Sequence, residues 1–124
     1  MAFFSCKKES DFTRVAKGAG QGVYYSLFVR SFADSNGDGT GDLKGIEQNL
    51  DYIQELGITG IWLLPIMKSH SYHGYDVDDY YSVNPEYGTM QDFEDLAASC
   101  KKKNISFPRK RFLFFIKNRV VKLL

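Results

Sequence analysis

The chain of 124 residues contains only two cysteines, Cys6 and Cys100, which are too few for a disulfide framework. It also has no apolar run near the roughly 18 residues that a membrane span requires, so we expect no transmembrane segment. Charges of opposite sign nearly cancel, and the net charge of +1 indicates no partner by itself. The hydrophobic share of 44% and the charged share of 25% are typical of one soluble globular domain.

Acidic residues are missing after Asp95, and the same stretch is rich in lysine and arginine. Basic clusters attract phosphates, which would fit a nucleic-acid or membrane binder. The Phe and Leu residues among these basic residues follow no clear amphipathic pattern, however. We therefore expect no nucleic-acid partner. The basic residues of the tail are Arg109, Lys110, Arg111, Lys117, Arg119 and Lys122.

The N-terminus has a short apolar piece that ends at Ser5-Cys6 and turns abruptly polar. This resembles the end of a bacterial lipoprotein signal, in which the cysteine becomes lipidated. A working signal needs an apolar region of about 7–15 residues, and only Ala2-Phe3-Phe4 is present here. Residues 1–20 are either the stump of such a signal, with a lipid anchor through Cys6 in a longer parent, or a frayed terminus. The compartment stays open between an extracellular, membrane-anchored lipoprotein and a cytoplasmic protein.

The middle of the chain alternates strand and helix patterns. Apolar, aromatic and β-branched residues predict buried strands over residues 22–32 and 58–66, the second ended by Pro65. A helix is predicted between them, with Gly57 at its C-terminal stop, and a second helix begins at an N-cap Thr89 with acids in its first turn. A long polar and aromatic loop is predicted over residues 67–88. The apolar positions of the first helix are Leu43, Ile46, Leu50, Ile53 and Leu56.

This order predicts an α/β fold, because short buried strands separated by helices form parallel sheets with crossover helices. A third strand should begin at Ile105. It does not continue well, because Pro108 has no N–H for a central ladder and Arg109 to Arg111 interrupt the apolar run.

The loop "DSNGDGTGDL" between the first strand and the first helix carries oxygen-bearing side chains that alternate with small residues. Calcium takes six to eight oxygen ligands, and glycines permit the tight curvature of such a loop. The opening is like that of an EF-hand loop, but Gly45 stands where the EF-hand needs a glutamate. The alternative is an ordinary turn built from Asx and glycine chemistry. The candidate ligands are Asp34, Asn36, Asp38, Asp42 and the backbone carbonyl of Thr40.

Two longer stretches carry a family resemblance. "YSLFVRSFADSNGDGTGDLKGIEQNLDYIQELGITGIWLLPI" followed by "SYHGYDVDDYYSVNPEYGTMQDFEDL" resembles the start of the catalytic domain of glycoside hydrolase family 13, the α-amylase family. The resemblance runs from about Val23 to Asn104, with several motifs in order and at the right spacing. It implies an α/β fold that is the first two βα units of a (β/α)8 TIM barrel, truncated.

The resemblance also implies site residues. In relatives with the same acidic loop, the positions matching Asp34, Asn36, Asp38, Asp42 and the Thr40 carbonyl bind calcium. The tyrosine matching Tyr75 stacks on the sugar ring next to the scissile bond, and His73 lies beside it in the HGY motif and contacts the same sugar. A packing role for Tyr75 and a local hydrogen bond for His73 are the structural alternatives. We expect Asp76, Asp78 and Asp79 to cap and tie the loop, and His70 to be an ordinary surface residue.

The resemblance stops before the catalytic residues. The family places its nucleophilic Asp, its acid/base Glu and a third Asp on strands four, five and seven, and this chain has none of these strands. We therefore assign no catalytic residue and expect a fragment, itself inactive, of an enzyme that hydrolyses α-glucan oligosaccharides with two carboxylates. The alternative is a non-enzymatic calcium- or sugar-binding module. Residues 21–105 form the partial catalytic domain, and residues 106–124 are an unrelated basic tail, either frameshifted or genuine.

Overall fold

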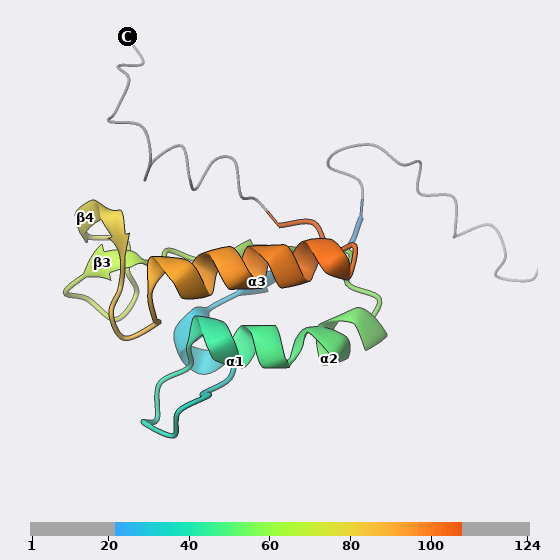
Figure 1. Ribbon diagram of the computed structural model, residues 1–124. Helices are drawn as coiled ribbons and strands as arrows, with labels where there is room; N and C mark the ends of the chain where they lie inside the picture. Colours follow the sequence, from blue (N-terminus) through green and yellow to red (C-terminus); the bar gives the residue numbers. More distant parts are fainter. Residues whose placement is uncertain (1–21, 108–124) are drawn as a thin grey trace, which may run out of the picture.

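The computed structural model describes residues 22–107, which form helices and short strands (Figure 1). The expected N-terminal segment with Cys6 and the basic tail from Pro108 onward lie outside the described residues. Within residues 22–107, no helix is both long and apolar enough to cross a bilayer. The elements in chain order are β1 (Tyr24–Leu27), the 3-10 helix η2 (Val29–Ser31), α1 (Leu43–Gln48), α2 (Leu50–Glu55), β2 (Gly60–Leu63), β3 (Met67–Ser69), β4 (Val77–Val83) and α3 (Met90–Lys102).

Strands β1 and β2 pair in parallel, in a register that runs from Tyr24 opposite Gly60 to Leu27 opposite Leu63. The expected third strand begins as an isolated parallel bridge between Gly60 and Ser106, beside β2. The strand expected over residues 22–32 is shorter than predicted, because the chain turns into η2 after Leu27. The predicted α/β arrangement, with a parallel sheet and crossover helices, is therefore confirmed.

The helices cover one face of this parallel pair. In Figure 1, α3 runs alongside α1 and α2. Leu27 and Ile61 from the strands are buried in one cluster with apolar side chains of all three helices. Burial of each such side chain is worth roughly 1.5–3 kcal/mol, so this cluster is the main source of stability. The fully buried helix residues are Leu43, Ile46, Leu50, Ile53, Phe93, Leu96 and Cys100. Leu56, which the helical spacing placed on the apolar face, is 54% exposed.

The single helix predicted over residues 42–57 is divided at Asn49, which lies between α1 and α2 with φ −106° and ψ 17°. The side-chain amide of Asn49 donates to the carbonyl of Gly45, 2.8 Å away. A side chain that bonds the carbonyl four residues back competes with the helix's own backbone hydrogen bond. The C-terminal stop is as predicted: Gly57 has φ +75°, and Ile58 N–H donates to the Ile53 carbonyl.

The segment over residues 67–88 is not a simple loop, and that prediction was wrong. Strands β3 and β4 pair antiparallel as a hairpin, with register shifts on both sides of Lys68. It projects beside the N-terminal end of α3 in Figure 1. The β-prone run from Val77 to Val83 builds β4, but its mixture of acids and tyrosines hides the usual alternation of apolar and polar residues.

One side chain of β1 reaches across the sheet. The ring of Tyr24 lies over Gly60, and a Cβ atom added at Gly60 would come within 2.4 Å of that ring. The Tyr24 hydroxyl donates to the Ser106 Oγ atom, 3.3 Å away. Tyr24 therefore links β1 to the start of the third strand by passing over β2.

Candidate functional site

Two polar loops follow the carboxyl ends of the two parallel strands. The acidic loop, residues 34–42, lies between η2 and α1, and the hairpin loop, residues 70–76, lies between β3 and β4, after β2. Carboxyl ends of parallel strands meet at one edge of a sheet, and in barrel and open α/β folds this edge carries the ligand-binding loops. The fold therefore brings both predicted site loops to the edge where a ligand site is expected.

The acidic loop is a series of turns closed by its own side chains. The Asp34 carboxylate accepts backbone N–H groups of Asn36 at 3.0 Å, Gly37 at 2.7 Å and Gly39 at 2.8 Å. These bonds, led by that of Gly39, hold the pKa of Asp34 below its usual value. Asp38 accepts the N–H of Thr40 at 2.8 Å. This is the hydrogen bonding of an Asx-type turn.

Asp42 joins the acidic loop to the first helix. One carboxylate oxygen accepts the Gly45 N–H at 2.6 Å as the N-cap of α1, and the other accepts the Ser35 N–H at 3.0 Å and hydroxyl at 2.8 Å. Its side chain is buried. Asp42 therefore has a structural role that is independent of any metal.

The residues predicted as calcium ligands share this loop, but their carboxylates do not converge. Within residues 22–107, no group of three or more His, Cys, Asp or Glu side chains is arranged to hold a metal ion. The oxygen-only set of donors still suits calcium, because a carboxylate oxygen that accepts one N–H keeps a second lone pair. Members of the family identified below commonly bind calcium.

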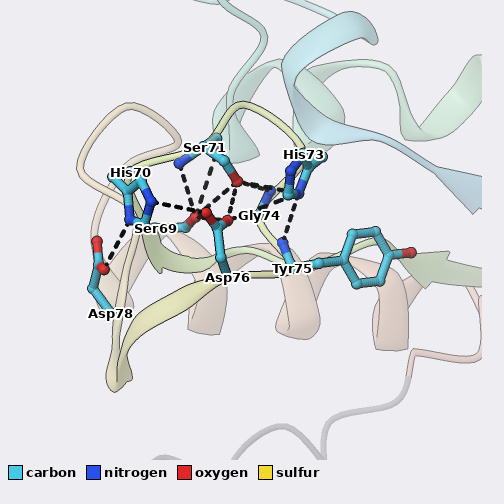
Figure 2. Close-up of polar contacts among 8 residues, drawn as sticks. All are labelled: Ser69, His70, Ser71, His73, Gly74, Tyr75, Asp76 and Asp78. Carbon is cyan, nitrogen blue, oxygen red and sulfur yellow. Dashed lines mark hydrogen bonds and ion pairs between the residues drawn. The ribbon is translucent and has the colours of Figure 1, made fainter.

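The hairpin loop is organised around the carboxylate of Asp76, as Figure 2 shows. Its Oδ1 atom accepts the hydroxyl of Ser69 at 2.8 Å and the hydroxyl of Ser71. Its Oδ2 atom lies 3.0 Å from Nε2 of His70. These contacts, led by the hydrogen bond from Ser71, lower the pKa of Asp76 to about 2. Asp76 therefore ties the loop, as predicted.

His73 and Tyr75 lie at the exposed end of this network. The Tyr75 N–H donates to Nδ1 of His73 at 3.2 Å, and Ser71 Oγ lies 3.1 Å from the same nitrogen. The two rings are tilted, with centroids 6.1 Å apart, and the Tyr75 ring points away from the polar network (Figure 2). Tyr75 is 67% exposed and lies outside the buried core, so its ring is accessible in this structure.

The sequence did not reveal the role of His70. It is exposed, as expected, but its ring lies between two carboxylates, since Nδ1 is also 3.0 Å from Asp78. The serines at 69 and 71 were missed as well. The only signal in the sequence is the alternation Ser-His-Ser just before the HGYD run, which places both hydroxyls within reach of one carboxylate.

Parallel βα units with a polar loop after each strand define the class of this chain: it is an α/β protein. A family model described as the alpha amylase catalytic domain matches residues 26–108. Alpha-amylase 3 of Dictyoglomus thermophilum is 58% identical over 83 residues, which are 67% of this chain and 17% of that protein. Oligo-1,6-glucosidase of Bacillus cereus is 46% identical over 86 residues, 68% of this chain and 15% of that protein.

A solved structure agrees with these sequence relatives. The alpha-amylase from H. orenii matches with a TM-score of 0.67 and 55% identity, over 69% of this chain and 19% of that chain. The chain belongs to the α-amylase family of glycoside hydrolases, and its described part folds as the first two βα units of a (β/α)8 barrel. It spans less than a fifth of the length of each of these relatives.

Proposed function

We propose that this chain carries the calcium loop and the first sugar-contact loop of an enzyme that hydrolyses α-glucan oligosaccharides, and that it binds such sugars without turning them over. The observation that carries the proposal is the exposed Tyr75 ring beside His73, at the carboxyl edge of the sheet. An aromatic face packs against the C–H groups of a sugar, while the tyrosine hydroxyl and an imidazole nitrogen hydrogen-bond its hydroxyls.

The relatives support the choice of substrate class. Their names are those of an alpha-amylase and an oligo-1,6-glucosidase. The linkage, α-1,4 or α-1,6, is not assigned. We infer the absence of turnover from the family resemblance, which places the nucleophile and the acid/base on strands that this chain does not contain. Release of reducing sugar from maltotriose by the purified chain would contradict this part of the proposal.

The sugar-contact proposal is tested by titrating the chain with maltotriose and following it by NMR. Tyr75→Ala should weaken binding by about 1 kcal/mol, about fivefold in Kd, because a stacking surface is lost. Tyr52→Ala is the matched control, since Tyr52 is an exposed tyrosine on α2, away from the hairpin loop. Equal affinities for the two variants would exclude Tyr75 as the sugar contact.

The calcium proposal concerns Asp34, Asn36, Asp38 and Asp42, together with the carbonyl of Thr40. It is supported by their alternating oxygen atoms in one loop whose glycines, Gly37 and Gly39, have φ of +82° and +88°. Calorimetric titration with calcium should give a binding heat that Asp38→Ala abolishes. Glu94→Ala, which removes the same charge from α3, should retain it. No heat in the unmodified chain would identify the loop as an ordinary Asx turn.

The remaining proposals concern the ends of the chain. We propose residues 21–105 as the partial catalytic domain and the preceding residues as an N-terminal segment. We expected an unrelated tail over residues 106–124, and because the family match extends to residue 108, we propose that this tail begins after it. A lipid anchor through Cys6 in a longer parent stays a proposal, and mass spectrometry of the membrane fraction tests it. Sequencing the coding DNA across Asn104 tests the tail, because a shifted frame that continues the barrel would identify a frameshift.

A further inference from the structure

The imidazole of His70 is held from both sides. Its Nε2 atom lies 3.0 Å from Oδ2 of Asp76, and its Nδ1 atom lies 3.0 Å from Oδ1 of Asp78. A neutral imidazole has one donor and one acceptor nitrogen, whereas an imidazolium has two donors. Both carboxylates can therefore accept an N–H from this ring only when His70 is protonated, and the imidazolium then forms ion pairs with Asp76 and Asp78 (Figure 2).

The carboxylate of Asp76 connects this cation to the proposed sugar contacts. Oδ2 faces His70, and Oδ1 accepts the hydroxyl of Ser71. The Ser71 oxygen in turn accepts the Gly74 N–H at 3.3 Å. Its 3.1 Å approach to Nδ1 of His73 carries no proton, because the Ser71 hydroxyl donates to Asp76 and Nδ1 accepts the Tyr75 N–H. A continuous polar path of three contacts therefore runs from His70 through Asp76 and Ser71 to the backbone N–H of Gly74, which lies between His73 and Tyr75.

The hydrogen bond between Tyr75 and His73 decides which nitrogen of His73 could donate to a sugar. The Tyr75 N–H donates to Nδ1 of His73, so Nδ1 acts as an acceptor and the proton of the neutral ring is on Nε2. An Nε2–H group is a donor, which suits a sugar hydroxyl oxygen. The same hydrogen bond holds the backbone at Tyr75, from which its exposed ring projects.

The charges around His70 favour its protonated form. Asp78 and Asp76 raise its pKa above the usual histidine value, with the hydrogen bond to Asp78 as the largest cause. Lys68 of β3 lines the same groove as His70, and its positive charge acts on Asp79, whose pKa it helps to lower. Arg30 and Glu86 also line this groove, but they form an ion pair of 2.7 Å with each other and largely cancel.

We propose that His70 is a positioning residue of the sugar-contact loop: its imidazolium holds Asp76 and Asp78 together and, through Asp76 and Ser71, fixes the orientation of His73 and Tyr75. The proposal deepens the proposed sugar contact and rests on it for the choice of ligand. Its structural part, the coupling of His70 to Tyr75, can be measured without any sugar.

The pH range of this coupling follows from the two shifts. Because the pKa of His70 is raised, its contribution to the stability of the loop is complete below about pH 6.5 and is lost as the pH rises through the pKa of the folded state. Because the pKa of Asp76 is lowered to about 2, its contribution is complete above about pH 4 and is lost as the pH falls toward 2. The loop should be most firmly ordered between about pH 4 and 6.5.

The chain offers a direct measurement, because His70 and His73 are its only histidines. An NMR pH titration of the full chain follows both imidazoles and the amides of Gly74 and Tyr75. We expect His70 to titrate above about 6.5 and both amides to shift with the same midpoint. Asp78→Asn should lower the titration midpoints of the His70 imidazole and the Tyr75 amide together. Asp79→Asn is the control and should leave both midpoints in place, because Asp79 accepts the Ser82 hydroxyl and does not contact His70.

A second variant separates positioning from simple stabilisation. In His70→Gln, the amides of Gly74 and Tyr75 should lose the titration step whose midpoint is that of the His70 imidazole in the unmodified chain. A Tyr75 amide that keeps this step, or that does not follow His70 in the unmodified chain, overturns the proposal. Should His70→Gln fail to fold, the joint shift of both midpoints in Asp78→Asn still decides the outcome.

Maltotriose titrations across pH then distinguish the two proposals. In the unmodified chain the Kd should rise about fivefold as the pH passes through the His70 midpoint, and in His70→Gln it should be independent of pH. No binding at any pH, with Tyr75 following His70, would refute the proposed sugar function and leave the positioning role intact. Binding whose pH dependence is the same in His70→Gln would refute the positioning role alone.

Discussion

At the scale of single residues, Asp42 shows how one carboxylate serves two segments. It is buried, caps α1 through Gly45 and holds the acidic loop through Ser35. We predict that Asp42→Ala lowers the free energy of unfolding by about 1–3 kcal/mol, because the helix loses its cap and buried N–H groups lose their acceptor.

Urea denaturation in the presence of a calcium chelator measures this effect without any contribution from a bound metal. Ser35→Ala is the control, since it removes only the hydroxyl donor and should cost about 1 kcal/mol or less. A loss below about 0.5 kcal/mol for Asp42→Ala would show that the acidic loop does not depend on this cap.

Residue types and the family resemblance together led to the predicted site. The alternation of oxygen-bearing residues in the acidic loop led us to predict calcium ligands, with an Asx-type turn as the alternative, and the resemblance of the HGY run led us to propose Tyr75 and His73 as sugar contacts. The sequence could not show that Asp76 collects the hydroxyls of Ser69 and Ser71 or that His70 bridges two acids. Those contacts depend on how the hairpin folds back, which residue identities do not encode locally.

At the scale of elements, α3 is defined by its N-terminal capping box. Thr89 accepts the Asp92 N–H at 3.2 Å, and Asp92 accepts the Thr89 N–H at 2.7 Å. Thr89→Ala should lower the free energy of unfolding by about 1 kcal/mol, whereas Thr89→Ser should retain most of it. Thermal unfolding followed by circular dichroism compares the two variants with the unmodified chain. A Thr89→Ala midpoint equal to that of Thr89→Ser would refute a role for the cap.

The elements also show which predictions local sequence supports. The N-cap at Thr89 and the stop at Gly57 were correct, because both depend on hydrogen bonds within one turn. The break at Asn49 and the β3–β4 hairpin were missed. The break at Asn49 depends on where its side chain points, which hydrophobic periodicity does not reveal. The hairpin depends on pairing between two segments whose apolar residues do not alternate.

At the scale of the whole molecule, the face of β2 away from the helices is aromatic. Trp62 and Tyr24 are 53% and 42% exposed there, while Ile61, the neighbour of Trp62 in the strand, is buried. Within the described residues, β1 pairs with β2 alone, and an open strand edge favours association. We predict that the isolated chain self-associates at micromolar concentrations, as sedimentation velocity would measure.

Trp62→Gln should reduce this association, whereas Tyr52→Gln on α2, which is 52% exposed, should not. A monomeric chain that melts in one sharp, cooperative transition would contradict the prediction. That result would mean that the aromatic face of β2 is covered by other parts of the chain in solution.

The thiol of Cys100 reports on global unfolding. It is fully buried in the core, and burial, with a smaller effect of Glu47, raises its pKa to about 12. Because the thiolate is the reactive form, Cys100 should resist iodoacetamide at pH 8 until denaturant unfolds the core. A Cys6→Ser variant leaves Cys100 as the single thiol, and rapid alkylation without denaturant would show that α3 does not dock as described.

The close approach of Tyr24 to Gly60 also constrains how this sequence can drift. While the tyrosine ring covers position 60, any side chain there would collide with it, and the ring can cover that position only while it is glycine. Position 60 can therefore gain a side chain only once the ring at position 24 is gone, whereas position 24 can become smaller on its own. Among homologous sequences, a residue larger than glycine at 60 should occur only together with a small residue at 24.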